Sequence, residues 1–185
     1  MSFLLFPPPK VAKFGSDTTC PNKRPYLKLR AQHSAIFTAA LQRFIANCPQ
    51  KLDLTFANVD PSNCFVTIEI RKTKSRHPEN YELINSDAGI ELYAANEIGL
   101  FRGLATLEQI LNQCQSQLLH FHISDEPDFE NRGVMLDVSR CKVPTLETLK
   151  NLIDKFAILK YNQLQLYTEH TFAFTQHPSV WAQSS

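Results

Sequence analysis

The stretch "RGVMLDVSRCKVP", from Arg132 to Pro144, decides how the C-terminal part of this chain is expected to fold. The apolar run from Val134 to Leu136 is typical of a buried strand. Asp137 interrupts that run, and Arg140 follows three residues later. A charge inside an apolar run costs free energy unless it is paired. We therefore expect Asp137 and Arg140 to mark the polar end of the strand.

The residues after this strand complete a strand–helix–strand pattern. Thr145 is a candidate helix N-cap, and an apolar stripe with helical spacing runs from Leu146 to Ala157 and ends near Lys160. The segment "NQLQLYTEH", residues 162–170, is a second strand. A unit of this length predicts two parallel strands joined by a right-handed crossover. A parallel sheet needs cover on both faces, so we expect this 185-residue chain to be a piece of a longer protein.

The residues before the quoted stretch predict a separate α+β domain. Residues 1 to about 32 are rich in Pro and Lys and are expected to be extended. A helix is expected from the candidate N-cap Ser34 to Pro49, and a second one over residues 96–113. The apolar face of the second helix is expected to hold Ile98, Phe101, Leu104, Ala105, Leu107 and Leu111.

Strand patterns complete this first domain. Two of the strands flank the turn "SDAG", Ser86 to Gly89, and predict a hairpin. The polar segment "SDEPDFENR", Ser124 to Arg132, reads as a domain boundary. The segments with strand patterns are residues 64–70, 81–85, 89–94 and 118–124.

Composition and charge exclude several classes of protein. A hydrophobic content of 43% and a formal net charge of +1 are typical of a soluble globular protein, and they favour neither a nucleic-acid partner nor a membrane. The five cysteines show no CxxC spacing, which suits a reducing compartment. The start "MSFLLFPPPK" does not fit a signal peptide, so we expect a cytoplasmic protein.

Polar residues gather where the two predicted parallel strands end. Asp137 and Arg140 follow the first strand, and Glu169 and His170 follow the second. Ligands bind at the carboxyl ends of parallel strands, so these residues are candidates for substrate binding. The alternative is that Asp137 and Arg140 form an ion pair that only fixes the loop. The sequence predicts no metal site, because His120 and His122 have no third ligand nearby in the sequence, and Glu169, His170 and His177 lack the spacing of a preorganised site. It predicts no cofactor either.

The same residues resemble a known family. "RGVMLDVSRCKVP" and "LKNLIDKFAILKYNQLQLY" are similar to the opening of the catalytic barrel of family-20 glycoside hydrolases, the β-N-acetylhexosaminidases. "GLFRGLATLEQIL" and "DEPDFENRG" resemble the end of that family's small α+β domain and its junction with the barrel. The resemblance implies an accessory domain over residues 1–128 and an incomplete (β/α)8 barrel over residues 129–185. The implied fold is a small, mostly antiparallel sheet with helices on one face, followed by the first β–α–β of a truncated barrel.

The resemblance also implies an activity. Such enzymes remove terminal β-linked N-acetylglucosamine or N-acetylgalactosamine by a retaining, substrate-assisted mechanism. The implied partner is an N-acetylhexosamine-containing glycan, bound by the full barrel. By this resemblance, Arg140 stands at the position of the arginine that binds the sugar hydroxyls in the family. Glu169 and His170 stand near the position of the family's sugar-binding Asp and are expected to bind substrate. Asp137 is expected to support the site. Gln165 and Tyr167 replace two histidines of the family's pattern, which indicates a divergent branch.

The resemblance places no catalytic residue in this chain, because the family's adjacent Asp-Glu pair belongs to the fourth barrel strand. We therefore expect the chain to be inactive alone. The uncovered barrel segment is expected either to disorder after about residue 130 or to drive self-association. The alternative function is a non-catalytic carbohydrate-binding or scaffolding module that keeps the architecture without the chemistry.

Overall fold

The computed structural model describes residues 3–20, 26–30, 33–49, 55–56, 64–73, 75–114, 117–140, 143–169 and 175–181. The chain divides into two compact units. The first comprises Met1–Glu130 together with Ile158–Lys160. The second comprises Asn131–Ala157 and Tyr161–Ser185. The first unit is therefore discontinuous in sequence, because the last residue of a helix, Ile158, and the two residues after it belong to the first unit.

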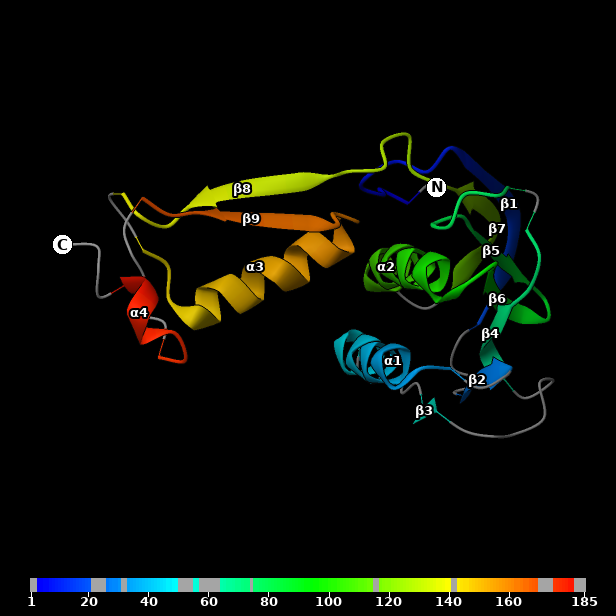
Figure 1. Cartoon of the computed structure of the whole chain (residues 1–185). Coiled ribbons are helices and arrows are strands. Elements are labelled where there is room, and N and C mark those ends of the chain that lie inside the picture. The colour runs from blue at the N-terminus through cyan, green and yellow to red at the C-terminus, as the bar shows by residue number, and fades with distance from the viewer. Residues whose placement is uncertain are drawn as a thin grey trace. The chain divides into compact units, whose positions relative to one another are not determined.

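Among the described residues of the first unit, seven strands form one sheet in the order β1-β7-β5-β6-β4-β2-β3 (Figure 1). Pairing is antiparallel from β1 through β7 and β5 to β6, and parallel from β6 through β4 and β2 to β3. The elements are β1 (Val11–Thr19), β2 (Tyr26–Arg30), α1 (Ala35–Asn47), β3 (Thr55–Phe56), β4 (Cys64–Ile70), β5 (Tyr81–Ser86), β6 (Gly89–Ala94), α2 (Glu97–Gln113) and β7 (Leu118–Asp125).

The local signals of this unit are confirmed. Ser34 caps α1, with its hydroxyl accepting a hydrogen bond from the backbone N–H of Phe37 at 3.1 Å. The hairpin β5–β6 turns at the two residues between Ser86 and Gly89, and Gly89 has a φ of 105° that favours glycine. The Pro-rich start was expected only to be extended, whereas β1 and β2 are paired strands of the sheet.

Both helices lie on one face of the sheet, where α2 covers β5 and β6 and α1 packs beside α2 (Figure 1). The expected apolar face of α2 was wrong at Ile98, which is 51% exposed because it lies in the first turn. Gly99 instead meets the sheet: a Cβ there would lie 2.2 Å from the backbone oxygen of Asn80. The buried core of the helix is formed by Leu100, Leu104, Leu107, Ile110 and Leu111.

The second unit contains the predicted strand–helix–strand pattern (Figure 1). Thr145 caps the helix, because its hydroxyl accepts a hydrogen bond from the backbone N–H of Thr148 at 3.2 Å. The side chains of Met135 and Leu146 are 62% and 69% exposed, and the self-association expected from such surface stays a prediction. The elements are β8 (Gly133–Asp137), α3 (Leu146–Ile158), β9 (Gln163–Tyr167) and a short α4 (Pro178–Trp181).

Candidate functional site

Strands β8 and β9 are parallel, so their carboxyl ends meet at one edge. Gly133 pairs with Gln163 at one end of the ladder, and Asp137 pairs with Tyr167 at the other. The backbone N–H of Val138 donates to the Tyr167 carbonyl at 3.0 Å, which extends the pairing by one residue. The loops after both strands therefore begin side by side, at the edge where α/β folds bind ligands.

Asp137 closes the turn that follows β8. Its Oδ1 accepts the backbone N–H groups of Ser139 at 2.9 Å and Arg140 at 3.2 Å. Its Oδ2 accepts Nε–H of the Arg140 side chain at 2.7 Å. The Ser139 amide, together with the Arg140 guanidinium, lowers the pKa of the Asp137 carboxyl from its usual value. The charge at the end of the apolar run is thus paired and hydrogen-bonded.

Arg140 is an exposed cation held between two carboxylates. Its Nη1 lies 3.6 Å from Oε1 of Glu169, in addition to the close contact with Asp137. The guanidinium carbon lies 5.4 Å from the centroid of the Tyr167 ring, within cation–π range. The side chain is 60% exposed, so solvent or a ligand can reach its outer nitrogens.

Glu169 is held by contacts from both strand ends. Its Oε1 accepts the Tyr167 hydroxyl at 2.9 Å, and its backbone N–H donates to the Ser139 hydroxyl. The hydrogen bond to Glu169 raises the pKa of the Tyr167 phenol. His170, the other residue expected near substrate, lies outside the described residues.

The structure therefore brings together three of the four residues singled out from the sequence: Asp137, Arg140 and Glu169. The ion pair offered as a loop-fixing alternative is present, and contact of Arg140 and Glu169 with substrate stays a prediction. Sequence reasoning assigned no role to Ser139 and Tyr167, which link the two strand ends. The register of β8 against β9 is the signal that could have found them, since it places Tyr167 opposite Asp137.

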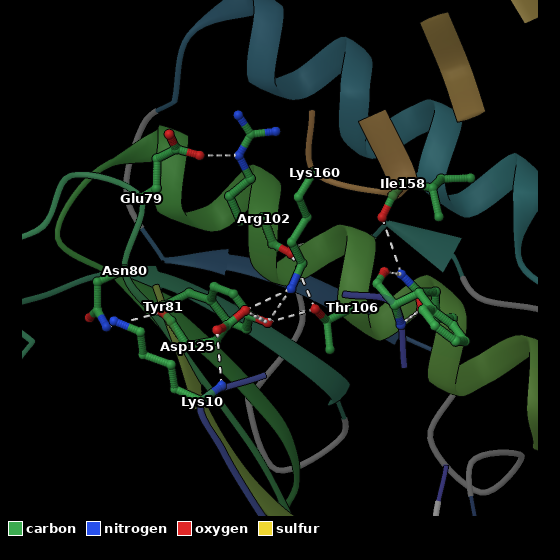
Figure 2. A network of polar contacts seen from close by, with 11 residues as sticks. Lys10, Glu79, Asn80, Tyr81, Arg102, Thr106, Asp125, Ile158 and Lys160 are labelled. Carbon is green, nitrogen blue, oxygen red and sulfur yellow. Dashed lines mark hydrogen bonds and ion pairs between the residues drawn. The ribbon is translucent and has the colours of Figure 1, made fainter. Parts of the chain in front are cut away.

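A second polar cluster lies inside the first unit (Figure 2). Lys160 Nζ donates to Asp125 Oδ2 at 2.8 Å and to the Tyr81 hydroxyl at 2.9 Å. Tyr81 in turn donates to Asp125 Oδ2 at 3.1 Å, and its oxygen lies 2.6 Å from the Thr106 hydroxyl. Burial, reinforced by the nearby Asp125, raises the pKa of Tyr81 well above its ordinary value. Figure 2 shows these side chains converging on the Asp125 carboxylate, which also accepts the Lys10 amide at 3.2 Å.

The position of Lys160 at the end of α3 is unusual. Its φ is 62°, in the region that favours glycine. The Tyr161 amide donates to the Phe156 carbonyl at 2.9 Å, and the rings of these two residues touch, with centroids 5.6 Å apart. This is the Schellman pattern that ends helices, in which the left-handed residue is commonly glycine. Here the left-handed residue is a lysine with a buried side chain that contacts Asp125 and Tyr81, a role that the sequence reading missed.

The histidines of β7 have carboxylate neighbours. His122 Nε2 lies 2.7 Å from Glu82 Oε2, and His120 Nε2 lies 3.5 Å from Asp87 Oδ1. Within the described part of the chain, no group of three or more His, Cys, Asp or Glu is arranged to hold a metal ion. In the same residues, every helix is too short or too polar to cross a bilayer.

Comparisons with known proteins agree with these two units. Residues 6–126 match the profile described as "Glycosyl hydrolase family 20, domain 2". Residues 129–177 match "Glycosyl hydrolase family 20, catalytic domain". A β-hexosaminidase of Vibrio furnissii is 41% identical over 75 residues, which are 40% of this chain and 12% of that protein.

Two solved structures show the same fold. A chitobiase from Flavobacterium johnsoniae aligns with a TM-score of 0.76 at 22% identity, over 95% of this chain and 29% of that chain. An exo-β-N-acetylglucosaminidase from Vibrio harveyi, solved in complex with N-acetylglucosamine, aligns with a TM-score of 0.74 at 22% identity, over 88% of this chain and 25% of that chain. The chain thus spans about a quarter of these solved chains. Because the first profile alone matches more than half of the 185 residues, the chain belongs to glycoside hydrolase family 20.

Proposed function

We propose that this chain forms the accessory domain and the first β–α–β unit of a β-N-acetylhexosaminidase. The enzyme would remove terminal β-linked N-acetylglucosamine or N-acetylgalactosamine with retention of configuration. The observation that carries the proposal is the exposed Arg140 guanidinium, held by Asp137 and Glu169 at the strand ends. These residues lie inside the segment that matches the family's catalytic domain.

Each of these side chains has a distinct role in the proposed complex. Arg140 donates from its outer nitrogens to ring hydroxyls of the terminal sugar, as a rigid and permanently charged donor. Glu169 accepts a hydrogen bond from a neighbouring hydroxyl. Asp137 keeps the guanidinium in place through the 2.7 Å contact and is itself held ionised by the Ser139 amide. His170 is proposed as a further substrate-binding residue.

The chemical step needs groups beyond these. In the proposed mechanism the substrate's own acetamido oxygen attacks the anomeric carbon, while an acid protonates the departing glycosidic oxygen. An adjacent Asp-Glu pair would orient the acetamide and transfer the proton. The only adjacent Asp-Glu in the sequence is Asp125-Glu126. Asp125 is buried against Lys160, and Glu126 accepts from Ser75 and Lys10, so both have structural partners. We infer that the 185-residue chain has no hydrolase activity alone.

The proposal is tested with a nitrophenyl N-acetylglucosaminide. The full-length protein encoded by the gene should release nitrophenol, and the 185-residue chain should not. Arg140→Ala in the full-length protein should lose about 2–3 kcal/mol of transition-state stabilisation, because a charge-assisted contact is removed. That loss corresponds to roughly a 30- to 150-fold fall in kcat/KM.

Arg132→Ala is the matched control, since Arg132 precedes the opposite end of the same strand and should keep wild-type kinetics. An inactive full-length protein that still binds N-acetylglucosamine would favour the non-catalytic carbohydrate-binding alternative. Wild-type kinetics in Arg140→Ala would assign the Asp137–Arg140 pair to loop structure alone.

A further inference from the structure

Tyr167 contacts both charged groups of the candidate site. It is the last residue of β9, and its carbonyl accepts the Val138 amide at 3.0 Å, which fixes its backbone against β8. Its ring lies 5.4 Å from the Arg140 guanidinium carbon, and its hydroxyl donates to Glu169 Oε1 at 2.9 Å. The half-buried Tyr167 side chain therefore contacts Arg140 with its ring and Glu169 with its hydroxyl.

The spacing between Arg140 and Glu169 shows what the tyrosine contact does. A closed Arg–carboxylate pair has N···O distances of about 2.7–2.9 Å. Here Nη1 of Arg140 and Oε1 of Glu169 are 3.6 Å apart, although both side chains are exposed enough to move closer. The oxygen that would close the pair is the one that accepts the Tyr167 hydroxyl. Tyr167 thus holds the Glu169 carboxylate near the Arg140 guanidinium but keeps it from closing a hydrogen-bonded pair with the outer nitrogens of Arg140.

We propose that Tyr167 is a positioning residue that keeps Arg140 and Glu169 apart as a donor and an acceptor for two neighbouring sugar hydroxyls. This inference rests on the proposed function, which has Arg140 and Glu169 touching the sugar. Without the phenol hydroxyl, Glu169 closes onto Arg140 and the two charges satisfy each other. The sugar then has to break that pair in order to bind.

The contact is tested first on the full-length protein by NMR of the Tyr167 ring. A hydrogen bond to a carboxylate raises the phenol pKa, so Glu169→Gln should lower the Tyr167 pKa relative to the wild type. Tyr161 serves as the reference ring, and its signals should be the same in both proteins. If the Tyr167 pKa is unchanged in Glu169→Gln, the hydrogen bond between Tyr167 and Glu169 is absent and the inference is overturned.

The role is tested by kinetics on the full-length protein. Tyr167→Phe should raise KM roughly tenfold and leave kcat nearly unchanged, because the contact is remote from the bond that breaks. In the Glu169→Gln background the same change should have no further effect, because Tyr167 acts through that carboxylate. Tyr161→Phe, which also removes a phenol hydroxyl from the second unit, is the matched control.

The outcomes separate this inference from the proposed function. An inactive wild type refutes the proposed function and, with it, any part of Tyr167 in sugar binding. An active wild type with an unchanged Tyr167→Phe variant refutes only the inference. Equal and additive effects of Tyr167→Phe in both backgrounds would assign Tyr167 to general stability instead of positioning.

Discussion

Replacing Lys160 by methionine tests whether the buried cluster of the first unit holds that unit together. The change keeps an unbranched apolar side chain and removes the ammonium group. In the wild type, that group donates to Asp125 at 2.8 Å and to Tyr81 at 2.9 Å. The side chains of Lys160 and Asp125 are only 7% and 10% exposed, so water cannot readily replace the lost cation.

The expected cost follows from this burial. Removing one partner of a buried ion pair destabilises a protein by about 3–5 kcal/mol, because the other charge stays buried without compensation. Asp125 keeps hydrogen bonds from the Lys10 amide and the Tyr81 hydroxyl, so we expect the lower end, about 3 kcal/mol. For a unit of this size, that corresponds to a fall of roughly 10 °C in the Tm of the first transition.

The assay is urea and thermal unfolding followed by circular dichroism. Lys155→Met is the matched control, because Lys155 is an exposed residue in the last turn of α3, the helix that precedes Lys160, and its loss should cost less than about 0.5 kcal/mol. A double-mutant cycle with Asp125→Asn should give a coupling energy of about 2 kcal/mol. A coupling energy below about 0.5 kcal/mol, or equal stabilities for the two lysine variants, would refute the reasoning.

Two further predictions concern Gly99 and Asp137. Gly99→Ala should cost about 1–3 kcal/mol in urea unfolding, because its Cβ would meet the Asn80 backbone oxygen at 2.2 Å, whereas Gly15→Ala, whose nearest neighbour is 3.4 Å away, should cost less. The lowered pKa of Asp137 means that its contribution to stability is present above the unfolded value near 3.8 and is lost as the pH falls through the folded value. Unfolding curves at pH values from about 6 to about 2.5 should show this loss in the wild type but not in Asp137→Asn, and identical pH profiles would contradict the assignment.

Local signals in the sequence predicted much of the fold because they act over a few residues. Ser34 and Thr145 cap helices as expected, since a hydroxyl before an apolar stripe has amides within reach. The hairpin followed from the two short strand patterns that flank the turn from Ser86 to Gly89, and parallel pairing of β8 and β9 followed from the length of the crossover.

Local sequence signals could not predict which strands pair when they are far apart in the sequence. Strand β1 has an almost fully exposed pattern and joins the sheet only through β7, about a hundred residues later in the sequence. Nothing local in residues 11–19 indicates that partner. The parallel half of the sheet was missed for the same reason, because β2 pairs with β4 across the intervening helix α1.

The sequence predicted which charged residues gather at the candidate site, but it did not predict the contacts that connect them. Asp137, Arg140 and Glu169 were found because charged groups at strand ends stand out against apolar runs. The contact between Tyr167 and Glu169 depends on side-chain direction beyond the last paired residue, which periodicity does not encode. Lys160 was missed because a lysine after a helix looks like an ordinary solvated residue, and only its backbone conformation reveals the buried role.

The discontinuity of the first unit bears on how such domains are exchanged during evolution or by protein engineers. A recombination point at residue 128, where the sequence predicts the domain boundary, would combine Asp125 of one parent with residue 160 of the other. If that residue lacks an amino group, the hybrid inherits a carboxylate in an apolar interior without its cation. Hybrids that also transfer residues 158–160 should tolerate the exchange better, and positions 125 and 160 should change together among relatives.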